Sequence, residues 1–482
     1  MEEVYIFRDE ELAYPDSSCA FSPSVKYPEY LWAELSAQEN NIYNAIRTMF
    51  HACGLDKKNY GTATWNPLGE YIQHGDVVLI KPNMVKHFNE IAENGTDCLY
   101  THPSLVRAVV DYVILALNGT GRIVIADAPV QSCDFEQFCR TSGYRAIIEF
   151  YRNRGVKVEF YDLRKAIGCY EKGMVVRHRG EEAYQDICVN LGPLSAFNDL
   201  SDEQLQRLRI TDYSPKVMNA HHSSGKHEYS VSAVALEANV IINMPKIKTH
   251  RLAGITGALK NMVGINSNKD YLPHHRLGTP SDGGDQFRDG GCIAGIVNRI
   301  VDLENDAIEI GNYRGAKVFN LLRRGGQKYL RICGPGRCIN GNWYGNDTIW
   351  RMVSDLNRIT QYGDENGKIC DARQRKMLIV GDMVVAGEGE GPLRPSPKYM
   401  GCMLFGSDPV SFDMAVAKLM GYALKELPVI WRNYMFHDEL TALPIASNWT
   451  EWNGKRIAEL ESGSSFLRPS GWEDGIEHKA QN

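Results

Sequence analysis

The sequence predicts an α/β protein with a mostly parallel central sheet flanked by helices, together with an N-terminal extension and an inserted small subdomain. The first reason is a set of apolar runs that are continuous rather than alternating, as in parallel strands buried on both faces. These runs span residues 77–80, 123–126, 240–242 and 377–380. The second reason is that helical segments alternate with strands along the chain. The third is that each run ends in polar or charged residues, which indicates one shared site at the carboxyl edge of the sheet.

Five divisions follow in chain order: an N-terminal extension packed on the core (1–74), a first α/β half (75–169), an insertion or subdomain (170–228), a second α/β half (229–425) and a polar C-terminal tail (426–482). Further strands are expected at 156–161 and 403–405. Helices are expected at 36–53, 104–117, 135–153, 231–238, 291–330, 349–361 and 409–420. The first helix opens with a capping box at Ser36 to Glu39. The second is bounded by Pro103 and by Asn118-Gly119, and Asp408 is predicted to cap the last.

Composition narrows the functional classes. A hydrophobic fraction of 43% and a charged fraction of 23% are those of a soluble globular protein, and a net charge of −6 argues against a nucleic-acid binder. The sequence has no apolar run of about 18 residues, and its first residues lack a signal-peptide pattern, so a cytoplasmic location is expected. The 12 cysteines include no C-x-x-C pair, which removes the ferredoxin, zinc-ribbon and thioredoxin signatures.

The stretch 239–264 carries the strongest chemical signal. Its apolar run is followed at once by Lys246, Lys248 and His250. A glycine-spaced segment comes next and opens a helix, whose unpaired backbone N–H groups and dipole favour an anion. The glycines allow the backbone to approach a ligand closely. The pattern lacks the spacing of a Walker loop. It predicts a small-anion site, and a surface lysine cluster after a buried strand is the alternative.

We assign candidate roles to the polar residues at these strand ends. The candidate catalytic residues are His250, Lys248 and Lys260. A clustered Lys with a lowered pKa acts as a base or nucleophile, and a neutral imidazole acts as a general base or a metal ligand. The candidate residues for binding the substrate or a cofactor are Lys81, Asn83, Lys246, Thr256, Gly257 and Asn261.

Histidines concentrate in one part of the chain. Six of the 13 lie between residues 221 and 275, and a glycine-rich loop at 268–285 carries two of them. Imidazole and carboxylate together suit a metal ion such as Zn, Fe, Ni or Mn. The candidate metal ligands are His274, His275, Asp285 and Asp127. No H-x-x-x-H pattern on a helix is present, so anion contact, acid–base work and plain surface histidines are the alternatives.

Acidic residues near the strand ends have structural alternatives. Asp127 is a candidate for binding a substrate hydroxyl or a metal, and its alternative is capping of the next loop. Glu388 and Glu390 lie in a glycine-rich turn, which lets a carboxylate project from a tight backbone. Asp413, one turn inside the helix that follows Asp408, is predicted to brace a neighbouring loop.

Several motifs in combination resemble domain of unknown function family 362. They are Lys81-Pro82-Asn83, Thr101-x-Pro103, the strand end at Asp127, K-x-K-T-H at 246–250, T-G-x-L-K-N-x-V-G at 256–264, E-x-E-G-P at 388–392 and S-D-P-V-x-x-D at 407–413. The resemblance covers residues 75–425 and implies a fold and a site, but no agreed reaction. Many members carry ferredoxin-type cysteine clusters for iron–sulfur centres, and this chain lacks them.

A second resemblance is more distant. The G-x-T-G-x-x-K segment at 254–260 resembles the glycine-rich lysine segment of the nickel-dependent lactate racemase family. This resemblance implies proton or hydride movement at a carbon next to a carboxylate.

These observations favour an enzyme that acts on a small anionic substrate, a carboxylate or a phosphate, through the Lys/His cluster, with or without a divalent metal. A non-catalytic binding protein for a small anion or a metal predicts the same cationic pocket without a titrating group. An iron–sulfur redox protein is the third alternative, and the missing cysteine clusters speak against it. The expected partner is a small anionic molecule, with no nucleic acid and no membrane, and homo-oligomerisation is left open.

Overall fold

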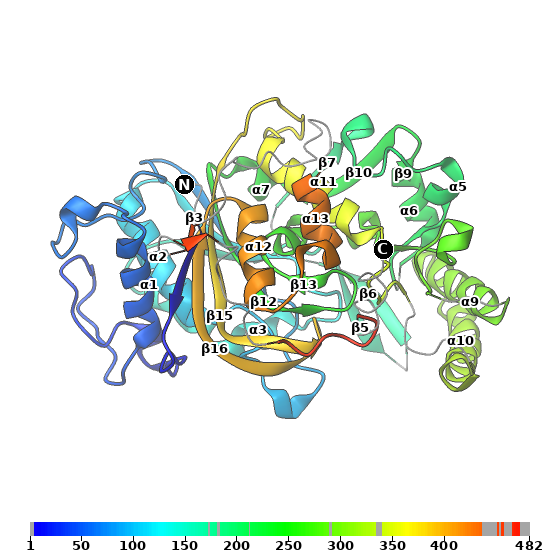
Figure 1. The fold of residues 1–482 in the computed structure, drawn as a ribbon, viewed down its shortest axis with the longest axis horizontal. Helices are drawn as coiled ribbons and strands as arrows, with labels where there is room; N and C mark the ends of the chain where they lie inside the picture. The colour runs from blue at the N-terminus through cyan, green and yellow to red at the C-terminus, as the bar shows by residue number, and fades with distance from the viewer. Residues whose placement is uncertain are drawn as a thin grey trace.

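The computed structural model describes residues 4–171, 174–180, 184–211, 213–288, 292–333, 340–435, 451–452, 455–456 and 465–472. A nine-stranded sheet forms the centre of the fold, and smaller sheets lie beside it (Figure 1). The strands of the central sheet are β1 (Tyr5–Arg8), β2 (Val77–Pro82), β3 (Arg122–Asp127), β4 (Val158–Asp162), β11 (Val240–Met244), β12 (Lys246–His250), β13 (Gly254–Thr256), β15 (Lys376–Glu390) and β16 (Arg394–Gly406).

The main path of the sheet has the strand order β1-β16-β15-β11-β2-β3-β4. The four predicted apolar runs are the adjacent strands β15, β11, β2 and β3, and every pair among them is parallel. The prediction of a mostly parallel α/β sheet is therefore confirmed. Their side chains are buried on both faces, which explains the continuous apolar pattern.

Two features of the sheet were not expected. One edge is antiparallel, because β16 returns beside β15 and β1 adds to β16. The expected strand at 403–405 is only the end of β16, whose first half alternates between buried and exposed residues and lacks an apolar run. The other feature is β12, which directly follows β11 and runs parallel to β15. The lysines expected after a strand end therefore lie on a strand of their own.

Most helices cover the two faces of the sheet, and the helices at 292–309 and 313–333 pack on each other in a hairpin that stands away from it. The helices are α1 (Asn41–Ala52), α2 (Pro103–Leu117), α3 (Phe135–Ser142), α4 (Tyr144–Arg152), α5 (Asp202–Gln206), α6 (Pro215–His221), α7 (Ala233–Glu237), α8 (Ala258–Asn261), α9 (Cys292–Glu309), α10 (Tyr313–Cys333), α11 (Ile349–Tyr362), α12 (Pro409–Leu419) and α13 (Pro428–Met435). Helices α1 to α4 share one core with Val78 and Ile80 of β2. Helices α7, α8 and α11 to α13 share the other core with Leu79. The alternation along β2 thus places one helical layer on each face.

Several helix boundaries differ from the predictions. The first helix begins after Asn40, whose side chain accepts a hydrogen bond from the backbone N–H of Tyr43, so the predicted capping box at Ser36 is wrong. The helix expected at 135–153 is divided at Gly143, which has a φ of 93° and ends α3. The helix expected at 231–238 is shorter, because β10 continues to Ser232. Asp408 caps α12 as predicted, by accepting from Ser411 N–H.

The polar insertion contains more regular structure than its sequence indicated. Its strands and their partners are β5 (Ala166–Glu171), β6 (Met174–Arg179), β7 (Asp186–Asn190), β8 (Leu208–Arg209), β9 (His222–Ser223), β10 (Lys226–Ser232) and β14 (His275–Arg276). Strand β8 pairs with β14, so the insertion packs against the second half of the chain. Short polar strands lack the apolar runs on which the prediction relied.

The expectation of a polar surface tail is wrong for part of the C-terminal region. Helix α13 packs on α11, and Phe466 and Trp472 belong to the main hydrophobic core. The indole N–H of Trp472 donates to the carbonyl of Arg251, 2.7 Å away. The short pair β17 (Glu451–Trp452) and β18 (Lys455–Arg456) completes the described structure, and residues 436–450 lie outside it. No helix in the described part of the chain is both long and apolar enough to span a bilayer.

Candidate functional site

A cavity of 470 Å³ opens at the carboxyl ends of β2 and β3, beside β12, β13 and α8. The candidate residues that line it are Asn83, Asp127, Lys248, His250, Thr256, Lys260, Asn261 and His274. Residues more than 190 positions apart in the sequence meet here because parallel strands end at one edge of the sheet. This is the position that the sequence predicted for the site.

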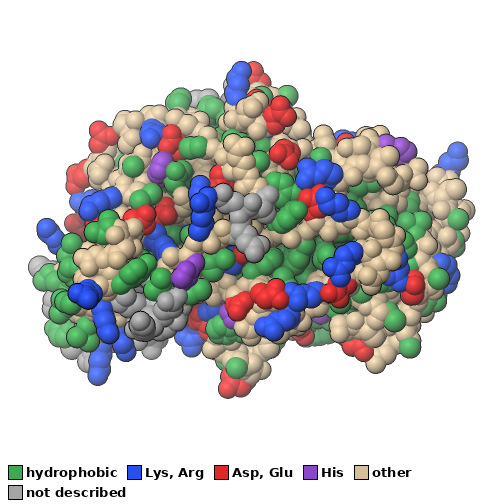
Figure 2. Space-filling view, turned by 180° about the vertical axis from the view of Figure 1, so that it is seen from behind, with side chains coloured by type: hydrophobic (Ala, Val, Ile, Leu, Met, Phe, Trp, Pro, Cys, Tyr) green, Lys and Arg blue, Asp and Glu red, His purple; other side chains and the backbone are tan. Residues whose placement is uncertain are grey.

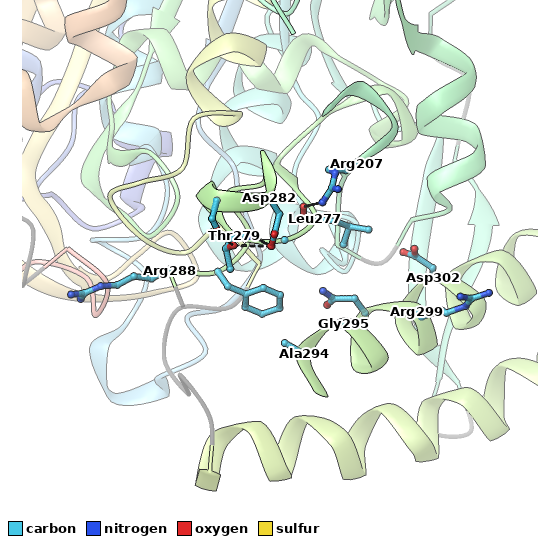
Figure 3. A pocket seen from close by; sticks show the side chains of 13 residues that line it. Arg207, Leu277, Thr279, Asp282, Arg288, Ala294, Gly295, Arg299 and Asp302 are labelled. Carbon is cyan, nitrogen blue, oxygen red and sulfur yellow. Dashed lines mark hydrogen bonds between the residues drawn. The ribbon is translucent and has the colours of Figure 1, made fainter. Parts of the chain in front are cut away.

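A larger cavity of 860 Å³ lies elsewhere, between the loop at 277–282 and helix α9. Figure 3 shows its lining, which includes Arg299 and Asp302 of α9 and Arg207, which follows α5. None of the candidate catalytic or ligand-binding residues lines it. Volume alone is a weak guide to function, so the smaller cavity with the convergent titratable groups is the candidate site.

A buried ion pair forms the floor of the site. Nζ of Lys81 lies 2.7 Å from Oδ1 of Asp127 and donates to Oδ1 of Asn261 at 3.2 Å. The other oxygen of Asp127 accepts from the backbone N–H of Met84 at 2.8 Å. Burial lowers the pKa of Lys81, and the neighbouring carboxylate opposes this shift. Since Asp127 is engaged in these contacts, its main role is to hold the strand ends together.

Gly264 is required at this floor. A Cβ on this residue would lie 1.8 Å from Oδ1 of Asp127 and 2.8 Å from Nζ of Lys81. Its carbonyl also accepts from the backbone N–H of Ala128. The absence of a side chain at Gly264 thus lets the backbone pack against the Lys81–Asp127 pair. Gly264 is the last glycine of the glycine-spaced segment described in the sequence.

Lys248 projects from β12 into the cavity wall. Its amine donates to Oδ1 of Asn83 at 2.5 Å and to the carbonyl of Leu99. Burial, and then the charge of nearby Lys246, lower the pKa of Lys248 well below its usual value. Burial thus disfavours the charged form of this amine, and an anion in the cavity would favour it.

Two further lysines face the same cavity. Lys260 has no hydrogen-bond or ion-pair partner among the described residues, and burial, with Lys269 and Lys81 nearby, lowers its pKa to about 7. Lys269 donates to the carbonyl of Ala128 at 2.8 Å, and burial lowers its pKa to about 8. Three lysines with lowered pKa values around one cavity make it a candidate site for an anion, because a bound anion would favour their charged forms.

The ring of His250 is fixed by the backbone. Its Nδ1 accepts hydrogen bonds from the N–H groups of Leu252 and Ala253, at 3.1 and 3.2 Å. A backbone N–H can only donate, so Nδ1 carries the lone pair and the proton of the neutral ring is on Nε2. Burial, and then the charge of Lys260, lower the pKa of His250 well below its usual value. His250 is therefore a neutral hydrogen-bond donor, and the predicted role of base or metal ligand through Nε2 does not fit it.

His274 has the opposite ring polarity. Its Nδ1 lies 2.8 Å from the carbonyl of Leu272, which can only accept, so Nδ1 carries the proton and Nε2 the lone pair. Burial, and then Lys260, lower the pKa of His274 to about 3. A neutral imidazole with an unpaired Nε2 can accept a proton, and an anion that offsets the charge of Lys260 would raise the basicity of this nitrogen from its low value. The two histidines that line the cavity thus form a donor and an acceptor.

The hydroxyl of Thr256 lies in the cavity wall and has no hydrogen-bond partner in the described structure. Its side chain is buried and lines the cavity, yet its Oγ1 makes no contact with a polar atom. Unpaired buried hydroxyls are costly and are usually satisfied by a ligand or by water. Thr256 is therefore a binding candidate on structural grounds as well as by sequence.

Three of the predicted binding residues do not line the cavity: Lys81, which lies beneath its floor, and Lys246 and Gly257, which lie outside it. Lys246 is fully buried at the first position of β12. Its Nζ lies 3.1 Å from Oδ2 of Asp382 and donates to the hydroxyl of Tyr14 at 2.7 Å. Gly257 contacts Asp413, and a Cβ there would lie 2.1 Å from its Oδ1. Both residues serve internal packing.

The interpretation of the helix start as an anion site is wrong. The N–H groups of Ala258 and Leu259, which begin α8, donate to the two carboxylate oxygens of Asp413 at 2.6 and 3.0 Å. The positive end of the helix is therefore occupied by a side chain of the protein itself. Asp413 braces this loop, as the sequence predicted.

The candidate metal ligands do not come together. His274 and Asp127 line the cavity, whereas His275 lies on β14 and lines another cavity, and its Nδ1 has no partner in the described structure. Asp285 accepts from Arg276 N–H, Asp347 N–H and the hydroxyl of Thr348. Within the described ranges, no group of three or more His, Cys, Asp or Glu residues has metal-site geometry. His275 lies on β14, whereas His274 belongs to the loop before that strand.

The carboxylates of the glycine-rich turn hold the C-terminal segment. Glu388 binds Lys398 at 3.1 Å and accepts from Leu467 N–H, and Glu390 accepts from Ser470 N–H at 2.7 Å. They lie at the end of β15 and do not line the cavity. Lys269 is the residue that the sequence reasoning missed, although it lies in the loop singled out for its histidines.

Comparisons with known proteins give the family. No curated protein matches the chain. A crystal structure of a protein from Thermotoga maritima is similar, with 11% sequence identity, a TM-score of 0.27 and coverage of 73% of this chain. The match spans 54% of that protein, about half its length. The family model for a domain of unknown function, DUF362, matches residues 78–178 and 181–418. This match covers most of the chain, which therefore belongs to the DUF362 family.

Proposed function

We propose that the chain is an enzyme that moves a proton at a carbon next to the anionic group of a small carboxylate or phosphate substrate. The observation that carries the proposal is the pair of neutral histidines in one cavity, His250 as a donor and His274 as an acceptor. A binding protein needs the cations but has no need of an unpaired imidazole base beside them.

The lysines supply the site for the anionic group. Lys260 and Lys269 have pKa values near neutrality, so an incoming anion shifts them to the charged form at little cost. Lys248 and Thr256 add further donors along the same wall. A cavity of 470 Å³ is at the lower end of the range for small-molecule pockets, which suits a substrate of modest size.

The proposed step uses the two ring nitrogens in sequence. Nε2 of His274 takes the proton from the carbon, and the electron pair of the broken C–H bond moves onto the adjoining carbonyl or carboxylate oxygen. The Nε2–H of His250, with a lysine ammonium, donates to that oxygen as its charge develops. Return of the proton to the same or a neighbouring carbon completes an isomerisation, so no redox partner is required.

Hydrogen exchange tests this step without knowledge of the product. The protein is incubated in D₂O with a panel of small hydroxy, keto and phospho acids, and proton NMR follows the loss of C–H signal next to the anionic group. We expect deuterium incorporation into at least one acid by the native protein. His274→Gln removes it, whereas His275→Gln, at the adjacent position outside the cavity, retains it.

The same experiment separates catalysis from binding alone. Saturable binding of a panel member without deuterium incorporation, measured by calorimetry on the same sample, assigns the chain to the binding class and overturns the proposal. Incorporation that survives His274→Gln unchanged removes His274 from the mechanism.

A further inference from the structure

The helical hairpin of α9 and α10 gathers apolar side chains on the surface. Of the large apolar side chains exposed in the described residues, most lie on this hairpin or its turn, and the others are scattered singly. Those of the hairpin are Ile296, Leu303, Ile310, Tyr313, Val318, Leu321, Leu322 and Tyr329. Exposed apolar side chains are ordinary one at a time, but a cluster marks an interaction surface.

Helix α10 is also strongly basic. Its sequence contains Arg314, Lys317, Arg323, Arg324, Lys328 and Arg331 and no acidic residue, in a chain with a net charge of −6. Arg323 is paired with Glu304 of α9 at 2.6 Å. The side chains of Arg314, Lys317, Arg324 and Lys328 are exposed and form no ion pair with any described residue. The local charge is thus opposite to that of the whole chain.

The basic and apolar side chains form two neighbouring stripes on the outer face of α10. Lys317, Leu321, Arg324 and Lys328 follow one another at spacings of four, three and four residues, which places them along one line of the helix. Val318, Leu322 and Tyr329 form the adjacent line. The inner face is a different set: Ala316 packs with Ala307 and Ile308, and Leu330 packs with Val297.

The hairpin is at an outer edge of the molecule, where α10 packs on α9 and stands away from the central sheet (Figure 1). In the opposite view, hydrophobic and basic side chains lie side by side along this edge (Figure 2). The outer face of α10 therefore lies at the periphery of the described structure.

We propose that the outer face of α10 docks on the surface of an anionic lipid bilayer. An amphipathic helix with aliphatic side chains beside Lys and Arg lies in the plane of the interface, with its apolar stripe among the acyl chains and its cations at the phosphates. Lysine stems extend from the apolar zone to the headgroups, which fits the mixed stripe of Leu321 between Lys317 and Arg324. Val318, Leu322 and Tyr329 supply the inserted side.

Two other occupants fit the surface less well. A second copy of the chain, docked through the same face, would bring like charges into contact across the twofold axis. A protein partner would place lysines in the centre of an interface, where they are depleted. The expectation of no membrane partner came from the absence of a spanning segment, and a helix that lies on a membrane needs none.

Vesicle binding tests this docking. The full chain is mixed with vesicles of phosphatidylcholine, alone or with phosphatidylglycerol, and the bound fraction is measured by co-sedimentation at low and raised salt. We expect binding that requires phosphatidylglycerol and weakens with salt. Arg324→Gln with Lys328→Gln should weaken it on the order of thirtyfold, since each surface cation contributes about a factor of five. Leu321→Asn with Leu322→Asn should also weaken it.

Matched control variants replace exposed lysines and an exposed leucine outside α10. Lys57→Gln with Lys58→Gln removes two exposed cations, and Leu31→Asn removes an exposed leucine, far along the chain from α10. Both controls should bind vesicles as the native chain does, and thermal melting confirms the fold of every variant. The proposal is overturned if phosphatidylglycerol has no effect, if the α10 variants bind normally, or if light scattering shows a dimer that the Leu321/Leu322 variant dissociates.

Discussion

Lys246 and Lys248 lie two residues apart on strand β12, yet only Lys248 lines the cavity, because the hydroxyl of Tyr14 and the carboxylate of Asp382 enclose the amine of Lys246. The ring of Tyr14 is stacked on His102, with ring centroids 4.0 Å apart, and both residues come from segments far from β12 in the sequence. Tyr14 of the N-terminal extension thus helps to keep the amine of Lys246 away from the cavity that Lys248 lines.

This relationship predicts different losses for two similar variants. Lys246→Met leaves Asp382 without its cation in a fully buried place, so the free energy of unfolding should fall by about 3–5 kcal/mol. Lys248→Met removes hydrogen bonds to Asn83 and Leu99 and should cost about 1–3 kcal/mol, but it should abolish most ligand affinity. Urea unfolding and calorimetric binding on both variants measure the contrast. Equal effects of the two on affinity would contradict the assignment of Lys248 to the site.

The ring polarity of the histidines leads to a spectroscopic prediction. In ¹⁵N-labelled protein, long-range proton–nitrogen correlation should show His250 with its proton on Nε2 and His274 with its proton on Nδ1, both neutral at pH 6. Burial and the nearby Lys260 keep both rings neutral. Either ring found in the other tautomer removes its assigned role as donor or acceptor.

Activity should follow the same polarity. His250→Leu lacks a donor to the developing oxyanion, and turnover should fall by about 10²–10³-fold. His250→Gln retains an amide N–H and an oxygen that can accept from Leu252 N–H, so it should recover part of the rate. A glutamine variant as inactive as the leucine variant would show that His250 acts as more than a hydrogen-bond donor.

Thr256 offers a test in which stability and function move in opposite directions. Thr256→Val keeps the shape of the side chain and removes a buried hydroxyl that has no partner, so the free energy of unfolding should rise by about 1 kcal/mol or more. The loss of a donor to a charged ligand should weaken binding by roughly ten- to a hundredfold. Thermal melts and binding isotherms on one sample give both values. A destabilised variant with normal affinity would make Thr256 a structural residue.

The parallel core could be predicted because β2, β3, β11 and β15 carry continuous apolar runs, and the ends of those runs indicated where the cavity with the candidate residues lies. Individual roles could not, because they depend on contacts between distant segments. Asp413 occupies the start of α8 from 155 residues away. The proton positions on His250 and His274 are set by local backbone geometry that no residue pattern encodes. The exposed stripes of α10 became visible only when its buried face was known.

The last prediction concerns pH. The pKa of Lys260 is about 7 in the folded protein, against an ordinary value of 10.5. The unfolded chain therefore binds more protons than the folded one between about pH 7 and 10.5, so the free energy of unfolding should rise with pH through this window. Lys260→Met should raise the stability at pH 7 and reduce that slope, whereas Lys58→Met, at an exposed lysine, should not.

Anion affinity should change in the opposite direction with pH, falling above about pH 7 to 8 as Lys260 and Lys269 lose their protons. Unfolding and binding measured from pH 6 to 9 check both slopes, and an affinity that is constant over this range would place the anion away from these two lysines.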